Sequence, residues 1–293
     1  MITYFVSLAL LAVIYGIAAI GLNILVGSAG IFSLAHAVFF GVGAYAAALM
    51  AIHVTPDILV CCGAAIGVTA VLSLCLAFPA LRVRGEYFVV ASLGLQMVAA
   101  TVFNEAQGVT GGYGGLAGIP APTIFGTFSL GTPTRLLLTS LGILLLGLGV
   151  VLAFMRHSFG RALGAIRDSE IAARAIGKNV ELLKTTAVVL GCTYAGVAGA
   201  LFAFDIAFIN PESFTLDQSG LILTMVVLGG AGTLLGPLVG AVILTLLPAL
   251  LTFLPMVPPT EIGTLQQFIY GLTMVLLMIF RPAGLVGRRS ARR

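Results

Sequence analysis

The chain has 293 residues, of which 14 are basic and 10 acidic, and its formal net charge is +4. Only 8% of the residues are charged, against about 25% in soluble domains, while 60% are hydrophobic and the mean hydropathy is +1.16. This composition cannot cover a water-facing surface, so it excludes an ordinary soluble enzyme and indicates no nucleic-acid partner. It predicts an all-α, polytopic integral membrane protein whose outer surface contacts the lipid bilayer.

Long apolar runs follow one another along the chain, and a lipid bilayer needs roughly 20 apolar helical residues for each crossing. Cutting the sequence where charge, proline or glycine interrupts these runs predicts about nine transmembrane helices, plus or minus one, in a single transmembrane domain over residues 1–293. The seventh segment is short, so it is either a half-helix buried in protein or the end of a helix that these cuts divide wrongly. The segments are residues 4–26, 36–52, 58–81, 87–103, 135–155, 185–204, 219–229, 234–253 and 265–280.

Basic residues are sorted to one side of this plan. If the nine segments alternate in direction, every lysine and arginine except Arg135 lies on one face, in the loop after the third segment, in residues 156–184 and in the tail 281–293. Basic loops are retained in the cytoplasm, so this face is predicted to be cytoplasmic, with the C-terminus inside and the N-terminus outside the membrane. The stretch 27–35 has no charged residue that would assign it to one side of the membrane, so it is a candidate re-entrant turn.

Polar side chains within the apolar segments are candidates for a solute pathway. Ser33 and His36 are three residues apart and share one helical face, and Gln96 lies within the fourth segment. His36 has two main interpretations, a hydrogen bond to a neighbouring helix or a place in the pathway lining. Catalysis by Ser33 and His36 is disfavoured because no nucleophile elbow or third orienting group is evident. We predict that Ser33, His36 and Gln96 lie near the translocation route.

Two glycine-rich stretches each allow two interpretations. Residues 104–120, on the predicted outer face, form either a flexible loop or a gate or docking surface for an external partner. Residues 226–248 contain Gly229, Gly230 and the four-residue spacing from Gly236 to Gly240, and small residues at that spacing usually allow helices to approach closely. Because glycines also expose backbone carbonyls at a helix end, Gly229 and Gly230 are assigned to the substrate pathway as well.

Residues 156–184 concentrate charge in a chain that is otherwise nearly free of it. A helix of about eight residues is predicted here, capped by Asp168 or Ser169 and ended by Gly177, and so short a helix needs a partner to pack against. Its apolar face is rich in alanine, which suits a groove on a soluble protein better than a lipid surface. The loop is therefore predicted to dock a cytosolic motor through Arg167, Asp168, Glu170, Ile171, Ala172, Ala175, Ile176 and Gly177.

The predicted membrane segments lack the groups that would let this chain power solute transport by itself. They contain almost no ionisable side chain besides His36, whereas proton-coupled carriers place Asp, Glu or His chains inside the membrane. No G-x-x-x-x-G-K-[ST] nucleotide loop occurs in the sequence either, and no paired cysteine spacing predicts a metal site. A solute pump of this kind must take its energy from another subunit. Sodium coupling through backbone oxygens stays open as the alternative.

Several ordered motifs resemble one family, the branched-chain amino acid permeases of ABC importers, in particular the LivM-like member of the permease pair. The resemblance covers most of the chain. It rests on GSAGIFSLAHAVFFGVGAYAAAL from Gly27, LRVRGEYFVVASLG from Leu81, TGGYGGLAGIP from Thr110, GRALGAIRDSEIAARAIGKNVELLK from Gly160, MVVLGGAGTLLGP from Met225 and FRPAGLVG from Phe280.

The resemblance implies a fold similar to that of type II ABC importer permeases. It implies a heterodimer with a homologous second permease, two cytosolic ABC ATPases on the 156–184 loop and an extracytoplasmic solute-binding protein. The ATPases would bind ATP and magnesium, and this chain would need no cofactor of its own. The expected function is import of branched-chain or related hydrophobic amino acids. The rivals are a stand-alone secondary carrier or channel and, more distantly, a membrane enzyme.

Overall fold

The computed structural model describes residues 2–82, 86–126, 128–252, 262–280 and 284–286. Each of the nine predicted apolar segments falls on one helix, because an apolar run within lipid can satisfy its backbone groups by forming a helix. These helices are α1 (Ile2–Asn23), α2 (His36–His53), α3 (Ile58–Arg82), α4 (Glu86–Glu105), α6 (Pro133–Arg156), α9 (Val180–Ile206), α10 (Leu216–Gly229), α11 (Gly236–Thr252) and α12 (Ile262–Phe280).

Short elements connect these helices. A π-helical turn, η1 (Ile24–Ser28), continues α1, and the loop after α6 contains α7 (Ser158–Asp168) and α8 (Glu170–Ala175). The remaining short helices are α5 (Gln107–Thr110), η2 (Gly112–Gly114) and η3 (Pro211–Phe214). Four two-residue strands form two antiparallel pairs, β1 with β4 and β2 with β3. The strands are β1 (Leu116–Ala117), β2 (Thr123–Ile124), β3 (Phe128–Ser129) and β4 (Phe208–Ile209).

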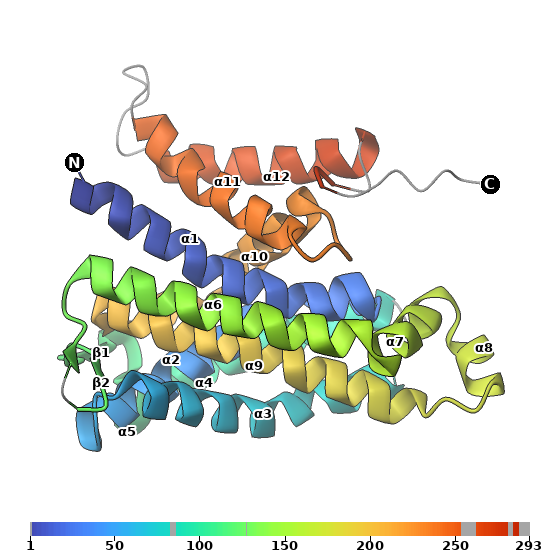
Figure 1. The fold of residues 1–293 in the computed structure, drawn as a ribbon, viewed down its shortest axis with the longest axis horizontal. Coiled ribbons are helices and arrows are strands. Elements are labelled where there is room, and N and C mark those ends of the chain that lie inside the picture. The colour runs from blue at the N-terminus through green and yellow to red at the C-terminus, as the bar shows by residue number, and fades with distance from the viewer. Residues whose placement is uncertain (1, 83–85, 127, 253–261, 281–283, 287–293) are drawn as a thin grey trace.

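The long helices run side by side in one bundle (Figure 1). Helix α9 packs against α1, α2, α3 and α6, while α10, α11 and α12 gather beside α1. The short strands and α5 lie at one end of the bundle, here named the strand end, where α1 begins. Helices α7 and α8 lie at the opposite end, here named the basic end, and α12 ends on the same side. The basic loop 156–184, which contains α7 and α8, thus lies at the end of the bundle opposite the short strands.

Glycine brings α2 and α9 into backbone contact at the centre of the bundle. A Cβ added at Gly43 would lie 2.1 Å from the carbonyl oxygen of Gly196, and one at Gly199 would lie 1.8 Å from that of Phe40. These distances are far below van der Waals contact, so only glycine allows this approach, as in other membrane helix pairs. By contrast, Gly63 and Gly67 on α3 have open space beside them.

The protein is an all-helical membrane protein with six long apolar helices and two shorter ones. The six that can cross a membrane by length and composition are residues Thr3–Ser28, His36–His53, Ile58–Phe78, Tyr87–Glu105, Pro133–Arg156 and Val180–Ile206, and the shorter pair is Leu216–Gly229 and Gly236–Ala249. Nine complete crossings stay a prediction. The bounds differ most at α9, which begins at Val180, inside the predicted 156–184 loop. There Asn179 caps the helix by accepting a hydrogen bond from the Leu182 N–H at 3.1 Å.

Candidate functional site

The first break, a non-helical stretch between two helices, lies between α1 and α2. After η1, residues 29–35 are not helical, and Gly30 adopts a positive φ of 71°. The ring of His36, the first residue of α2, lies 3.1 Å from the carbonyl oxygen of Ala18 on α1. Ala18 precedes Ser28 by ten residues, or about 15 Å of helix, so the chain has turned back along α1 before α2 begins. The predicted re-entrant stretch 27–35 is therefore present, and α2 begins inside the bundle.

The second break lies between α9 and α10. After β4, the short helix η3 leads the chain back into the bundle, where Phe214 is fully buried. Its ring lies among Phe40, Tyr45 and Phe103, with centroid distances of 5.9, 5.6 and 6.1 Å. Helix α10 begins two residues later, beside the start of α2. Two helices thus begin side by side inside the bundle.

A buried polar cluster joins these two helix starts, and we define it as Ser92, Gln96 and Ser219 with the backbone of residues 34–37. The Ala37 N–H donates to Ser219 Oγ at 2.9 Å, and Ser219 Oγ donates in turn to Gln96 Oε1 at 3.3 Å. Gln96 Nε2 donates to the Phe214 carbonyl at 2.8 Å, and the Leu34 N–H donates to Ser92 Oγ at 3.0 Å. The three side chains are at most 2% exposed. The cluster carries hydrogen-bonding groups but no formal charge.

Three predicted pathway residues are found at or beside this cluster. Gln96 belongs to it, while Ser33 and His36 flank it and are both 1% exposed. The contact of His36 with Ala18 matches the interpretation of a hydrogen bond to a neighbouring helix. Sequence reasoning missed Ser92 and Ser219. Ser92 precedes Gln96 by four residues on α4, and this shared helical face was the available signal.

Gly229 and Gly230, which were also assigned to the substrate pathway, lie away from the polar cluster. They end α10 at the basic end, ten or more residues beyond Ser219 and hence about 15 Å away along the helix. A Cβ at Gly229 would lie 1.7 Å from the Gly236 carbonyl oxygen, so this glycine serves close packing with the start of α11. The N–H groups of Leu285 and Val286 donate to the Leu228 and Gly229 carbonyls at 2.9 and 3.0 Å. Packing, the other interpretation of these glycines, fits the geometry.

A second polar group lies at the basic end, and we name it the helix-end hub: Asn23, Gly27, Arg167, Gly232 and Thr233. The Asn23 amide donates to the Thr233 carbonyl and accepts from the Gly232 N–H, both at 2.8 Å. Arg167 Nη1 donates to the Gly27 carbonyl at 2.5 Å. The hub therefore joins the end of α1, the end of α7 and the turn between α10 and α11.

The loop between α6 and α9 contains two helices instead of the one predicted. Ser169 caps α8 by accepting from the Ala172 N–H at 3.3 Å, and Gly177, with a φ of 75°, follows its end. The predicted face is open, since Ile171 is 76% and Ile176 68% exposed, and Ala172 and Ala175 are exposed beside them. Glu170 ties α8 to the start of α9 through Lys184 at 2.7 Å. Asp168 and Arg167 are both exposed, but the Arg167 guanidinium reaches the Gly27 carbonyl of the hub.

The glycine-rich stretch after α4 is ordered against the chain that follows α9. Thr110 Oγ1 donates to the Phe103 carbonyl at 2.6 Å, and Leu116 pairs with Ile209 between β1 and β4. A Cβ at Gly115 would lie 2.4 Å from the Ile209 carbonyl oxygen. This packing links the strand end directly to the chain that leads into α10.

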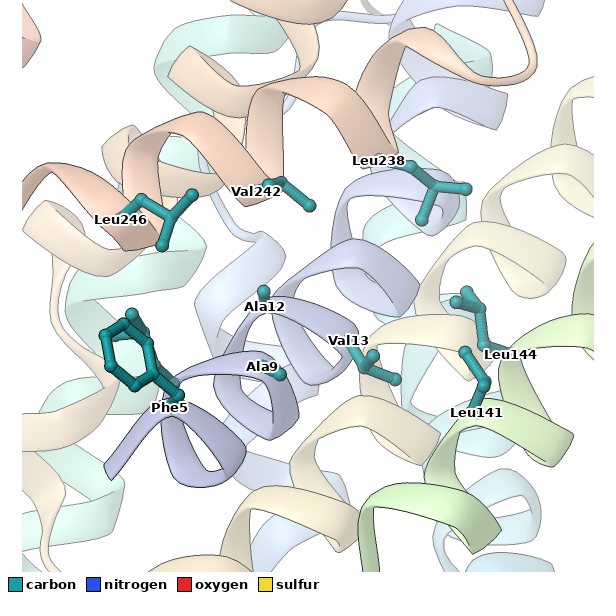
Figure 2. A pocket seen from close by; sticks show the side chains of 10 residues that line it. Phe5, Ala9, Ala12, Val13, Leu141, Leu144, Leu238, Val242 and Leu246 are labelled. Carbon is teal, nitrogen blue, oxygen red and sulfur yellow. The ribbon is translucent and has the colours of Figure 1, made fainter. Parts of the chain in front are cut away.

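A cavity of about 470 Å³ lies between α1, α6 and α11 (Figure 2). Its walls are apolar side chains, among them Phe5, Leu144 and Val242. It offers a zwitterion neither a donor nor an acceptor from a side chain, so it is unsuited to binding one. Within the described residues, no group of three His, Cys, Asp or Glu side chains could hold a metal ion.

Comparison with known proteins identifies the family. Residues 4–278 match the family model described as "Branched-chain amino acid transport system / permease component". The chain is 34% identical to the high-affinity branched-chain amino acid transport system permease protein LivM of Salmonella typhimurium and 33% identical to that of Escherichia coli, over 96% of this chain and 69% of each relative. It is 25% identical to a probable LivM of Methanocaldococcus jannaschii over 71% of this chain and 62% of that protein. No solved structure matched. The chain belongs to the family of permease components of branched-chain amino acid transport systems.

Proposed function

We propose that this permease moves branched-chain or related hydrophobic amino acids into the cytoplasm through the polar cluster. One observation carries the proposal: α2 and α10 both begin inside the bundle and meet through the hydrogen bond from Ala37 to Ser219. A helix start is the positive end of the helix dipole and attracts an anionic group such as a carboxylate. The uncharged Ser92, Gln96 and Ser219 are hydrogen-bond partners that a zwitterion can exchange for its hydration shell without a permanent charge to trap it.

The surroundings of the cluster favour an apolar amino-acid side chain. Phe40 and Phe214 are fully buried with ring centroids 5.9 Å apart, and Tyr45 adds a third ring beside Phe214. Such an aromatic wall next to a few polar groups is the usual composition of a small-molecule site. We propose that Ser33 and His36 border this route and that rearrangement of the two breaks opens it.

The energy is proposed to come from two cytosolic ATPases that dock on α8. The support is the exposed apolar face of Ile171, Ala172, Ala175 and Ile176 on a helix of six residues, which is too short to be stable unless something packs against it. Asp168, Glu170 and Gly177 border this face, while Arg167 at the end of α7 holds the Gly27 carbonyl of the hub. The protein would then lie in a bacterial inner membrane, with its basic end facing the cytoplasm and the start of α1 on the outer side. A homologous second permease and an extracytoplasmic binding protein complete the proposed importer.

The test uses the permease co-expressed with its homologue and ATPases and reconstituted in vesicles with the binding protein. ATP-driven uptake of radiolabelled leucine is expected. The change Ala175→Asp places a carboxylate where the docking groove expects a methyl group, which should cost about 3 kcal/mol or more if the carboxylate stays unpaired. Uptake and stimulated ATP hydrolysis should be lost together, and the ATPases should no longer co-purify.

The matched control is Ser158→Asp, which adds the same charge to an exposed position of the same loop, at the start of α7. This variant should behave like the wild type. Wild-type uptake and hydrolysis by Ala175→Asp would contradict docking at α8. Uptake driven by a sodium gradient without ATP would contradict the importer and favour the carrier.

A further inference from the structure

Arg167 is the one predicted coupling residue that the fold turns toward the bundle and away from α8. It lies in the last turn of α7, directly after the buried Ile166, and its Nη1 donates to the Gly27 carbonyl at the end of η1. Its aliphatic stem runs beside the backbone of Gly30, where an added Cβ would lie 3.2 Å from Arg167 Cγ. One side chain of the loop therefore touches both the end of α1 and the beginning of the first break.

The chemistry of this contact is that of a cap supplied by another element. The last carbonyl groups of a helix have no partner within the helix and form its negative end. Arginine satisfies such carbonyls well, because its planar guanidinium is always charged and directs several donors. The end of α1 is thus completed by a residue from the proposed ATPase-docking loop.

The capped segment leads directly to the polar cluster. From Gly27 the chain passes through Gly30 and reaches Leu34, whose N–H is bound by Ser92. The Ile31 N–H donates back to the Leu25 carbonyl at 2.9 Å, so this segment is held at its start by α1 and at its end by α4. Because the segment is held at both ends, a displacement of Gly27 is expected to move Leu34 and the Ala37 N–H as well.

The same displacement also reaches the second break. Gly27 lies against the turn between α10 and α11, since a Cβ added to it would lie 2.2 Å from the Gly232 nitrogen and 2.3 Å from Asn23 Oδ1. Asn23 holds this turn with two hydrogen bonds. The helix that carries Ser219 ends directly before this turn, at Gly229. Both helix starts of the polar cluster are therefore connected to the hub.

We propose that Arg167 is the positioning residue that transmits movement of the ATPase-docked loop to the polar cluster, by holding the Gly27 carbonyl at the end of α1. This inference rests on the proposed function and adds to it a mechanical link. Arg167 does not bind the ATPase or the solute in this scheme. It makes the position of residues 27–37 depend on the position of α7.

The experiment compares Arg167→Met with Arg167→Lys in the complete complex. Methionine keeps an unbranched apolar stem beside Gly30 but removes the charge and all donors, whereas lysine keeps one charged donor group. The matched control is Arg161→Met on the same helix, because Arg161 Nη1 contacts only the neighbouring Arg156 carbonyl, at 3.4 Å, among the hydrogen bonds of the described residues. Four quantities are measured: co-purification of the ATPases, unstimulated hydrolysis, uptake of labelled leucine, and hydrogen exchange of the amides of residues 27–37.

Arg167→Met is expected to keep co-purification and unstimulated hydrolysis within about two-fold of the wild type and to lower uptake about ten-fold. Arg167→Lys should restore much of the uptake, and Arg161→Met should resemble the wild type. Exchange at residues 27–37 should rise in Arg167→Met alone, since the cap that holds this segment is gone.

Other outcomes would overturn the proposal. Uptake by Arg167→Met equal to that of Arg161→Met means that the cap transmits nothing. Loss of co-purification in Arg167→Met assigns the residue to the docking face instead. If the wild-type complex itself shows no ATP-driven uptake, the proposed function fails and the link fails with it, whereas a normal wild type with normal Arg167→Met rejects the link alone.

Discussion

The polar cluster and the helix-end hub solve the same problem with different chemistry. In both, helix ends leave backbone groups without partners in their own helix, and other elements supply those partners. At the cluster, the partners are the uncharged side chains of Ser92, Gln96 and Ser219. At the hub, they are the guanidinium of Arg167 and the two-point contact of Asn23.

The difference indicates what each region has to do. Neutral partners exchange easily for those of a passing solute, because no charge has to be desolvated or left unpaired when the bond breaks. The hub uses a charge-assisted bond and a reciprocal amide pair, which are stronger and fix direction as well as distance. We therefore expect the hub to behave as a rigid joint and the cluster as the part that rearranges.

The largest expected effect comes from a methyl group in the hub. Gly27→Ala would put a Cβ 2.2 Å from the Gly232 nitrogen, against backbone that cannot rotate away. We expect a loss of about 3 kcal/mol or more in the stability of the folded permease, measured by thermal unfolding in detergent. Gly164→Ala on α7 is the control, because open space surrounds that position. An unchanged melting temperature for Gly27→Ala would mean that the hub yields and is no rigid joint.

A smaller effect on stability, but a large one on transport, is expected at the cluster. Gln96→Leu keeps the bulk of the side chain and leaves the Phe214 carbonyl without its partner, which should cost about 1–3 kcal/mol. Leucine uptake should fall while assembly with the partner subunits persists. Thr101→Leu is a control on the exposed side of the same helix, where the hydroxyl bonds only the Met97 carbonyl of its own helix among the hydrogen bonds of the described residues. Equal uptake by both variants would remove Gln96 from the route.

The smallest effect is expected outside both regions. Glu170 forms ion pairs with Arg174 at 2.9 Å, whose side chain is 52% exposed, and with Lys184 at 2.7 Å, whose side chain is 12% exposed. Water and salt screen the exposed pair, and glutamine can still accept a hydrogen bond from Lys184, so Glu170→Gln should change stability by about 1 kcal/mol. The measurement is the melting temperature at low and high salt. A larger shift would show that α8 is held to α9 by charge and not by docking.

The sequence predicted the helices well, because a long uncharged apolar run has few alternatives in a membrane. The uncharged stretch 27–35 also pointed to the first break. The second break was indicated only by the shortness of the seventh segment, since the depth at which α10 begins is set by the burial of Phe214 among rings from α2 and α4, far away in the sequence. The short helix α7 was missed because its charged residues hid a buried face made of Ala162, Leu163 and Ile166.

The candidate site could be predicted only in part. Gln96 and His36 are conspicuous in apolar helices, but serine is common there and its partners are remote: Ser92 binds Leu34, and Ser219 binds Ala37. Gly229 and Gly230 show the opposite problem. A glycine at a helix end exposes backbone equally in a pathway and in a tight packing contact, and only the close approach of Gly236 and Gly284 distinguishes the two.

The pairing of Leu285 and Val286 with the end of α10 has a consequence for biosynthesis. The Leu228 and Gly229 carbonyls emerge from the ribosome well before the residues whose N–H groups satisfy them, because α11 and α12 are translated in between. Until then this end of α10 depends on water or on the insertion machinery for its hydrogen bonds. The end of α10 is thus completed only after α12 has been made, and a substitution that displaces Leu285 or Val286 would interfere with maturation before it could affect transport.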